Sequence, residues 1–286
     1  MAVENKHFVP SAYSEKLTRR ALFGKGVKIA EGGISILLVA KVFGFPAINP
    51  EYPTFEAIDQ ITLDKLSKYE GFQTVAHNGG NLYSNYRQFK LTGCDYIETD
   101  VFSYHDTIYV GHEGYFVGIG IDSSRGSITF SRPSREFRRV AREIKKDGYR
   151  LLVDFKDTSS TDKVLDILEE HGMLSSAIFS SEAWSVLNKV KDRQNGEASN
   201  LFYTVQNQRG VETFLKQSSL PNGPFGISLD KSVSSEENIR KFKEAGGKVF
   251  VYVVKTARDA VKVLANGADG LITNNLSLLS FQSKTF

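Results

Sequence analysis

Two acidic residues, Glu98 and Asp100, stand two positions apart inside an apolar run, Tyr96–Val101. Side chains two apart in a strand share one face, so both carboxylates point into the interior of a buried sheet. Carboxylates placed side by side there repel each other and lose hydration, so they need a cation. Asp154, at the end of a later apolar run, offers a third carboxylate. The pattern predicts a divalent metal site, with Mg²⁺ as the first choice and Ca²⁺ as the second. The alternative is a set of structural ion pairs with buried lysine or arginine.

Two histidines flank this acidic pair in the sequence. His77 ends an apolar run before it, and His112 follows an extended run after it. Imidazoles titrate near neutrality, so the two can act as general base and general acid on one displacement. Either histidine alone would more often be a structural residue. His105 lies in a predicted turn, 104–107, and is expected at the surface.

Lys156 stands two residues after Asp154, so it is predicted to face the same interior. An ammonium beside a metal–carboxylate site can bind a phosphate oxygen as a point charge. A metal, a lysine and two histidines together favour phosphoryl transfer. No dinucleotide fingerprint, P-loop, Gly-x-Ser-x-Gly or His-Glu-x-x-His pattern competes with this interpretation.

Eight short apolar runs from residue 72 onward must position these side chains. They are continuous rather than alternating, which is typical of parallel strands buried on both faces. Helical patterns separate them, and eight strand–helix units predict an α/β fold, a closed TIM (β/α)8 barrel. The expected strands are Thr74–His77, Tyr96–Val101, Arg150–Asp154, Ala177–Ser181, Leu201–Val205, Gly226–Asp230, Val249–Val254 and Gly270–Asn274. The expected helices are Asn85–Leu91, Ser134–Lys146, Thr161–His171, Glu182–Lys191, Val211–Gln217, Ser235–Ala245 and Ala257–Ala265.

The first 70 residues lack this rhythm and are predicted to be an N-terminal extension to a barrel spanning residues 71–286. Arg19-Arg20 precedes an apolar stretch, Ile34–Ala40, in an order that resembles a twin-arginine export signal. The stretch is too short to span a bilayer, which takes about 20 residues. Export or membrane association is one interpretation. The other is a helix packed on the barrel of a cytoplasmic protein.

Composition limits the remaining possibilities for the 286-residue chain. Its 36 basic and 33 acidic residues do not favour a nucleic-acid partner, and its one cysteine excludes an internal disulfide. Six basic residues lie outside the apolar stripe of the predicted helix 134–146. They are expected to be solvated surface, with attraction to anionic lipid as the alternative.

The motif set resembles the glycerophosphodiester phosphodiesterase family. The residues that carry the resemblance are His77-Asn78-Gly79-Gly80, Ser84-Asn85, Gly93–Val101 with its Glu-x-Asp, His112 and the closing segment Gly267–Asn274. The resemblance implies a TIM barrel over roughly 71–279. It also implies a divalent metal held by Glu98, Asp100 and Asp154, catalysis by His77 and His112, and phosphate contact by Lys156.

The chain departs from the family pattern at several positions. Asn78 replaces the expected phosphate-binding arginine, and Tyr252 replaces a tryptophan. Both are predicted substrate-binding residues. Asp154 replaces a glutamate, and Asp154-Phe155-Lys156 is similar to the related spider-venom phospholipase D toxins, which also lack the arginine. The toxins carry disulfides that this chain cannot form.

The sequence therefore predicts a metal-dependent phosphodiesterase whose partner is a small or lipid phosphodiester, with a membrane surface as a further partner. The alternatives are transfer to a neighbouring substrate hydroxyl to give a cyclic phosphate, a phosphodiester-forming synthase, and a non-catalytic barrel that binds phosphorylated head groups.

Overall fold

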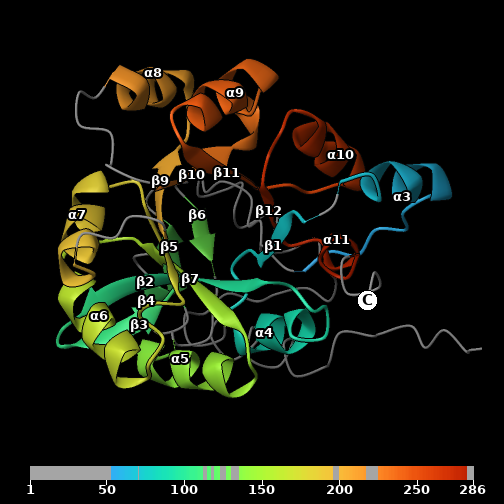
Figure 1. Cartoon of the computed structure of the whole chain (residues 1–286). Coiled ribbons are helices and arrows are strands. Elements are labelled where there is room, and N and C mark those ends of the chain that lie inside the picture. The colour runs from blue at the N-terminus through green and yellow to red at the C-terminus, as the bar shows by residue number, and fades with distance from the viewer. Residues whose placement is uncertain are drawn as a thin grey trace, which may run out of the picture. The chain divides into compact units, whose positions relative to one another are not determined.

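The computed structural model describes residues 53–69, 71–111, 115–116, 119–122, 127–129, 135–195, 200–216 and 225–281. Within them, parallel strands close into a barrel in the order β1-β12-β11-β10-β9-β8-β7-β2, and β1 pairs with β2 to complete the ring (Figure 1). The barrel strands are β1 (Gln73–Ala76), β2 (Tyr96–Tyr104), β7 (Arg150–Phe155), β8 (Ile178–Ser181), β9 (Leu201–Val205), β10 (Phe225–Asp230), β11 (Gly247–Tyr252) and β12 (Gly270–Thr273). The TIM-barrel prediction is confirmed.

Helices alternate with the strands along the chain and surround the barrel (Figure 1). They are α3 (Gln60–Leu66), α4 (Tyr83–Phe89), α5 (Phe137–Lys146), α6 (Thr161–Glu170), α7 (Trp184–Arg193), α8 (Gln208–Lys216), α9 (Glu236–Glu244), α10 (Ala257–Ala265) and α11 (Leu276–Leu279), with a 3₁₀ turn, η1, at Lys231–Val233. No helix in these described segments is long and apolar enough to cross a membrane.

The segment between β2 and β7 interrupts the alternation of strands and helices. β3 (Thr107–Val110) turns back and pairs antiparallel with the end of β2, and His105 lies exposed in the turn between them. A separate antiparallel sheet follows, formed by β4 (Tyr115–Phe116), β5 (Ile119–Asp122) and β6 (Ser127–Thr129).

The strands differ from their predicted bounds at the ends. The seventh barrel strand begins at Gly247 and ends at Tyr252, rather than running from 249 to 254. The helix after β8 begins at Trp184, because the Ser181 hydroxyl accepts a hydrogen bond from the Ala183 backbone and holds Glu182 in a loop. Such ends depend on hydrogen bonds that hydrophobic periodicity does not encode.

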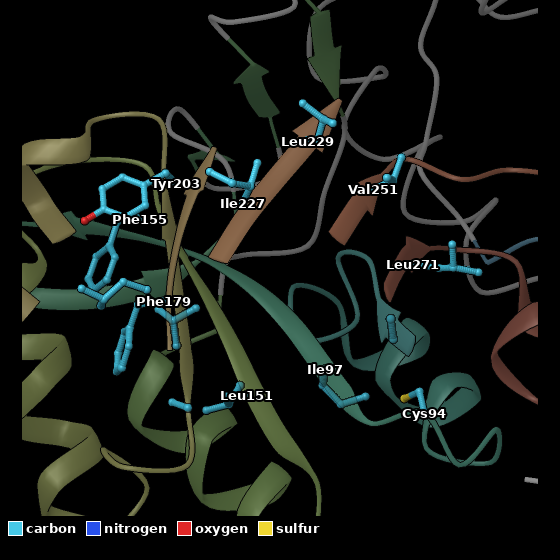
Figure 2. Close-up of a cluster of buried hydrophobic side chains, with 14 of the residues drawn as sticks. Cys94, Ile97, Leu151, Phe155, Phe179, Tyr203, Ile227, Leu229, Val251 and Leu271 are labelled. Atoms are coloured by element: carbon cyan, nitrogen blue, oxygen red, sulfur yellow. The ribbon is translucent and has the colours of Figure 1, made fainter. Parts of the chain in front are cut away.

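Alternation along the strands divides the core into two parts. Side chains that face outward fill the space between the barrel and its helices, as Figure 2 shows for Ile97, Leu151, Phe179 and Ile227. The second part is the barrel interior, which is filled by Val75, Tyr96, Leu152, Ile178, Phe202, Phe250 and Ile272.

Two glycines make the interior packing possible. The rings of Phe202 and Phe250 lie 4.7 Å apart inside the barrel. A Cβ on Gly226 would come within 2.3 Å of the Phe202 ring, and one on Gly270 within 2.6 Å of the Phe250 ring. The large rings therefore depend on neighbours without a side chain, and together they close the middle of the barrel.

Helix α5 shows how the sequence forms the outer layer. Phe137, Val140, Ala141 and Ile144 recur at helical spacing and are all buried. Arg138 and Arg139 lie on the exposed side and pair with Glu170 and Glu143. The basic face of this helix is thus partly neutralised by neighbouring acids.

Residues 53–59 and α3 contact the barrel. The Thr54 backbone donates to the Asn274 carbonyl oxygen, just beyond the carboxyl end of β12. The Glu56 carboxylate accepts from the Ala257 backbone at the start of α10 and from the Asn275 side chain, each at 2.8 Å. The rest of the predicted extension, including Arg19-Arg20 and the stretch 34–40, lies outside the described residues, and the boundary at residue 71 stays a prediction.

Candidate active site

The adjacent strands β2 and β7 bring the predicted acidic residues together. One carboxylate oxygen from each of Glu98, Asp100 and Asp154 lies within 4.8 Å of the others. Asp100 and Asp154 are register partners on the adjacent strands β2 and β7. Glu98 is 3% exposed and Asp100 1% exposed, so the cluster is largely out of contact with water.

The loop after β1, which carries His77, reaches this cluster through its backbone. The His77 backbone donates to the Thr273 carbonyl oxygen at 2.9 Å, which fixes it at the end of β1 next to β12. Asn78 follows in the left-handed region at φ 54°, where asparagine is among the most tolerated residues. This turn directs the Asn78 backbone N–H to the Glu98 carboxylate, with which it forms a hydrogen bond.

The Lys156 ammonium lies between two of the acids. It is 2.8 Å from Asp100 Oδ1 and 2.5 Å from Asp154 Oδ2. Lysine was expected to face inward at this position, and it does. Its ion pairs with Asp100 and Asp154 are those expected from the alternative interpretation, in which the acids form structural ion pairs. Contact between Lys156 and phosphate stays a prediction.

The charged groups in this cluster shift one another's pKa values. Burial raises the pKa of Glu98 well above its usual value, and the carboxylates of Asp100 and Asp154 raise it further. Burial alone would lower the pKa of Lys156, but the three carboxylates together hold this pKa well above its usual value. Three carboxylates face one ammonium, so the cluster lacks two positive charges when all three acids are ionised.

This donor set suits a hard divalent cation. All three side chains offer oxygen ligands, they converge from two strands, and their mutual repulsion is relieved by added positive charge. Glu98, Asp100 and Asp154 are the residues that would hold the ion. The arrangement does not select between Mg²⁺ and Ca²⁺.

Two residues in the cluster were missed by sequence reasoning. The Asn81 amide donates to Asp100 Oδ2 and to Asn78 Oδ1, both at 2.6 Å, and its oxygen accepts from the Asp100 backbone at 3.0 Å. The Ser180 hydroxyl donates to Asp154 Oδ1 at 2.8 Å. The turn sequence Asn78-Gly79-Gly80-Asn81 could have indicated the first. Ser180 carried no signal beyond its position at the end of a predicted strand.

The other predicted site residues lie as follows. The Asn78 amide nitrogen is 3.4 Å from His77 Nδ1. Tyr252 ends β11 and packs on the side chains that fill the barrel interior. His112 lies outside the described residues, but the Gly111 backbone donates to the Asp100 carbonyl oxygen at 2.9 Å, so the chain enters that segment beside the acidic cluster.

The fold and site define a class: a TIM barrel with an acidic cluster at the carboxyl ends of its first strands. No protein-family model matches the chain, and a search of curated proteins finds no match.

Solved structures match in fold. A protein from Silicibacter pomeroyi that is assigned as a glycerophosphoryl diester phosphodiesterase superposes with a TM-score of 0.59 at 12% identity, over 73% of this chain and 91% of that one. A glycerophosphodiester phosphodiesterase from Thermotoga maritima gives 0.55 at 19% identity, over 72% and 96%. An Oleispira antarctica phosphodiesterase, solved with the product sn-glycerol-3-phosphate, gives 0.58 at 16% identity, over 77% and 99%. The resemblance predicted from the sequence is thus confirmed at the level of the fold, while the likeness to the spider-venom branch stays a prediction.

Proposed function

We propose that this chain is a metal-dependent phosphodiesterase that hydrolyses glycerophosphodiester-type or phospholipid-type phosphodiesters. The observation that carries the proposal is the convergence of Glu98, Asp100 and Asp154 at the carboxyl ends of the barrel strands, next to the loop that carries His77. Catalytic residues of TIM barrels lie at that end. The shared fold of the phosphodiesterases described above supports the same reaction class.

In this proposal Glu98, Asp100 and Asp154 would hold a divalent cation, which when bound would supply stabilisation of the charge that develops on the phosphate oxygens. His77 either removes a proton from the attacking hydroxyl, or attacks phosphorus itself to form a phosphohistidine that water then hydrolyses. His112 donates a proton to the oxygen of the leaving alcohol as its bond to phosphorus breaks. Asn81 and Ser180 hold Asp100 and Asp154 in place through their hydrogen bonds. Lys156, Asn78 and Tyr252 contact the substrate.

Product analysis tests the reaction class. The purified full-length chain is incubated with Mg²⁺ or Ca²⁺ and candidate diesters, and the products are identified by ³¹P NMR. A phosphomonoester and a free alcohol support hydrolysis. A cyclic phosphate indicates attack by a neighbouring substrate hydroxyl, and a new diester indicates a synthase.

A second candidate is a non-catalytic barrel that binds phosphorylated head groups. The two ion pairs of Lys156 favour it, because an ammonium already balances part of the acidic charge, and so does Asn78 in place of the family's arginine. This candidate predicts measurable binding of a diester by calorimetry together with no product by ³¹P NMR. Turnover that depends on His77 excludes it.

Localisation is a separate proposal, which depends on Arg19-Arg20 and the apolar stretch 34–40. We infer that this region directs export or membrane association. Deleting Met1–Ala47 should then leave an active barrel that stays in the soluble cytoplasmic fraction. A truncated chain that is insoluble would show instead that the segment packs on the barrel.

A further inference from the structure

Helices α4 and α5 form one surface on the side of the barrel. The Tyr86 hydroxyl of α4 donates to the Asp147 carboxylate at the end of α5 at 2.6 Å, and Lys90 pairs with the same carboxylate at 3.3 Å. Near the start of both helices, the Arg135 guanidinium lies 5.2 Å from the centre of the Tyr83 ring. The two helices therefore run side by side in the same direction, at the bottom of Figure 1.

This surface concentrates the positive charge of the chain. Residues 83–91 and 135–147 hold eight basic and three acidic residues. The whole chain has 36 basic and 33 acidic residues, so the rest of the molecule has a small acidic surplus. A positive surplus on one side of an otherwise balanced molecule attracts an anionic partner to that side.

The outward row of α5 is entirely basic. Arg139, Arg142 and Lys146 recur at helical spacing on the side opposite the buried stripe, and all three are exposed. Arg87 adds a fourth exposed cation from α4. Arg139 pairs with Glu143. The other three form no ion pair with any acidic side chain that the structure describes, so their charges are available to a partner.

Two exposed apolar side chains border these cations. Leu91, which follows α4, is 81% exposed, and Tyr83 at the start of α4 is 50% exposed. The Lys90 carbonyl oxygen accepts from the Tyr149 hydroxyl at 2.5 Å, which fixes the chain next to Leu91. Leucine and tyrosine beside lysine and arginine are the combination that binds the boundary between lipid head groups and acyl chains. A purely ionic partner, such as a nucleic acid, would leave Leu91 in water.

We propose that this surface docks the protein on an anionic lipid membrane. We call it the α4–α5 face, and it consists of Tyr83, Arg87, Leu91, Arg139, Arg142 and Lys146. The cations bind the lipid head groups, and Leu91 enters the boundary of the acyl chains. Both helices run from the carboxyl ends of the strands toward the amino ends. The docked barrel therefore lies on its side, with its mouth opening along the membrane.

Co-sedimentation with vesicles tests the proposal on the full-length protein. One vesicle contains equal parts of phosphatidylcholine and phosphatidylglycerol, and the other contains phosphatidylcholine alone. The partition coefficient should be about hundredfold higher for the anionic vesicle, because each cation near an anionic surface strengthens binding about fivefold. The difference should shrink as the salt concentration rises, since salt screens exposed charges.

A triple variant connects the binding to the face. Arg87→Gln, Arg142→Gln and Lys146→Gln together remove three exposed charges without breaking a described ion pair, and glutamine is a good helix former. Partition onto the anionic vesicle should fall about hundredfold. If the triple variant does not fold by circular dichroism, Arg142→Gln alone takes its place, with an expected loss of about fivefold.

A matched control removes the same number of charges elsewhere. Arg209→Gln, Arg258→Gln and Lys262→Gln exchange exposed cations of α8 and α10, which follow β9 and β11 and lie away from α4 and α5 in Figure 1. The control variant should bind the anionic vesicle nearly as well as the wild type. Both triple variants have the same net charge, so a difference between them locates the contact.

Leu91→Ser tests the apolar part of the face. It should weaken binding to the anionic vesicle several-fold at every salt concentration, because it removes apolar area and no charge. Ile61→Ser is the matched control, since Ile61 is 69% exposed on α3, and it should bind as the wild type does.

Each outcome decides the matter. Equal partition onto the two vesicles overturns the proposal, and so does anionic binding that both triple variants retain or lose to the same extent. Binding that the α4–α5 variant loses but Leu91→Ser fully retains would show that the face attracts anions without entering lipid, and the membrane assignment would fall. None of these measurements needs turnover, so the result is independent of the proposed phosphodiesterase activity.

Discussion

Charged side chains are paired differently at the two ends of the barrel. At the amino ends of the strands, which we call the floor, Arg150 pairs with Asp95 at 3.4 Å and lies 4.1 Å from the centre of the Tyr96 ring. Lys248 donates to the Gln73 amide oxygen at 2.5 Å, close to the Phe250 ring. Each floor cation thus has a polar partner and an aromatic face, and each is partly hydrated.

At the mouth, three carboxylates share one ammonium, and Glu98 and Asp100 are almost completely buried. Buried like charges cost free energy, so this arrangement is not one that the fold needs for its own stability. The floor shows that this sequence can balance charge where the fold alone requires it. The surplus at the mouth is therefore the feature that indicates a function.

The largest effect is expected from removing charge at the mouth. Glu98→Gln or Asp100→Asn should lower phosphodiester turnover by about 10³-fold or more, because the donor set for the cation is broken. Binding of a divalent ion, measured by calorimetry, should be lost in the same variants. Wild-type activity that survives a chelator would contradict the metal assignment.

Exchange of either histidine should cost roughly 10²–10⁴-fold, the usual contribution of a general acid or base. His112→Ala should impair diesters with a poor leaving alcohol and spare an activated aryl diester, whose leaving group needs no proton. His77→Ala should impair both, because attack is required in either case. Equal losses for both variants on both substrates would disprove this assignment of roles.

Exchange of one basic residue at each end compares the two ends directly. Lys156→Met should lower the free energy of unfolding by about 3 kcal/mol in chelator, because breaking a buried pair leaves its partners uncompensated. A divalent ion should restore more stability to this variant than to the wild type, since it replaces the missing charge. Thermal unfolding with and without Mg²⁺ measures both effects. A variant that is destabilised equally under both conditions would argue that no cation binds the acids.

The smallest effect is expected at the floor. Arg150→Met should lower the free energy of unfolding by about 1 kcal/mol or less, because its ion pair is partly exposed to solvent. Its stability should not depend on divalent ions, and its kcat/KM should match that of the wild type. A large loss of activity would show that the two ends are coupled, and the comparison would then need revision.

The barrel could be predicted because its information is local. Continuous apolar runs separated by amphipathic helices specify buried parallel strands, and the shared inward face of Glu98, Asp100 and Asp154 follows from alternation along β2 and β7. The carboxyl ends of those strands had to converge once the sheet closed. The acidic cluster was therefore predictable from spacing alone.

Contacts between distant segments could not be predicted. Asn81 joins Asp100 to Asn78, and Ser180 holds Asp154. Glu56 accepts hydrogen bonds from the start of α10 and from Asn275, both about two hundred residues further along the chain. Each of these depends on side-chain geometry that arises when the ring of strands closes.

The sequence by itself determined that this protein is an α/β barrel with acids, lysine and histidine at one end, because strand periodicity fixes which face each side chain occupies. Tertiary structure decided that Lys156 lies between Asp100 and Asp154 and that the Tyr252 hydroxyl is left without a partner among the described residues. The reason is that hydrogen bonds and ion pairs act over about 3 Å. Distances of that scale are set by how the strands tilt and close, and one-dimensional spacing does not contain them.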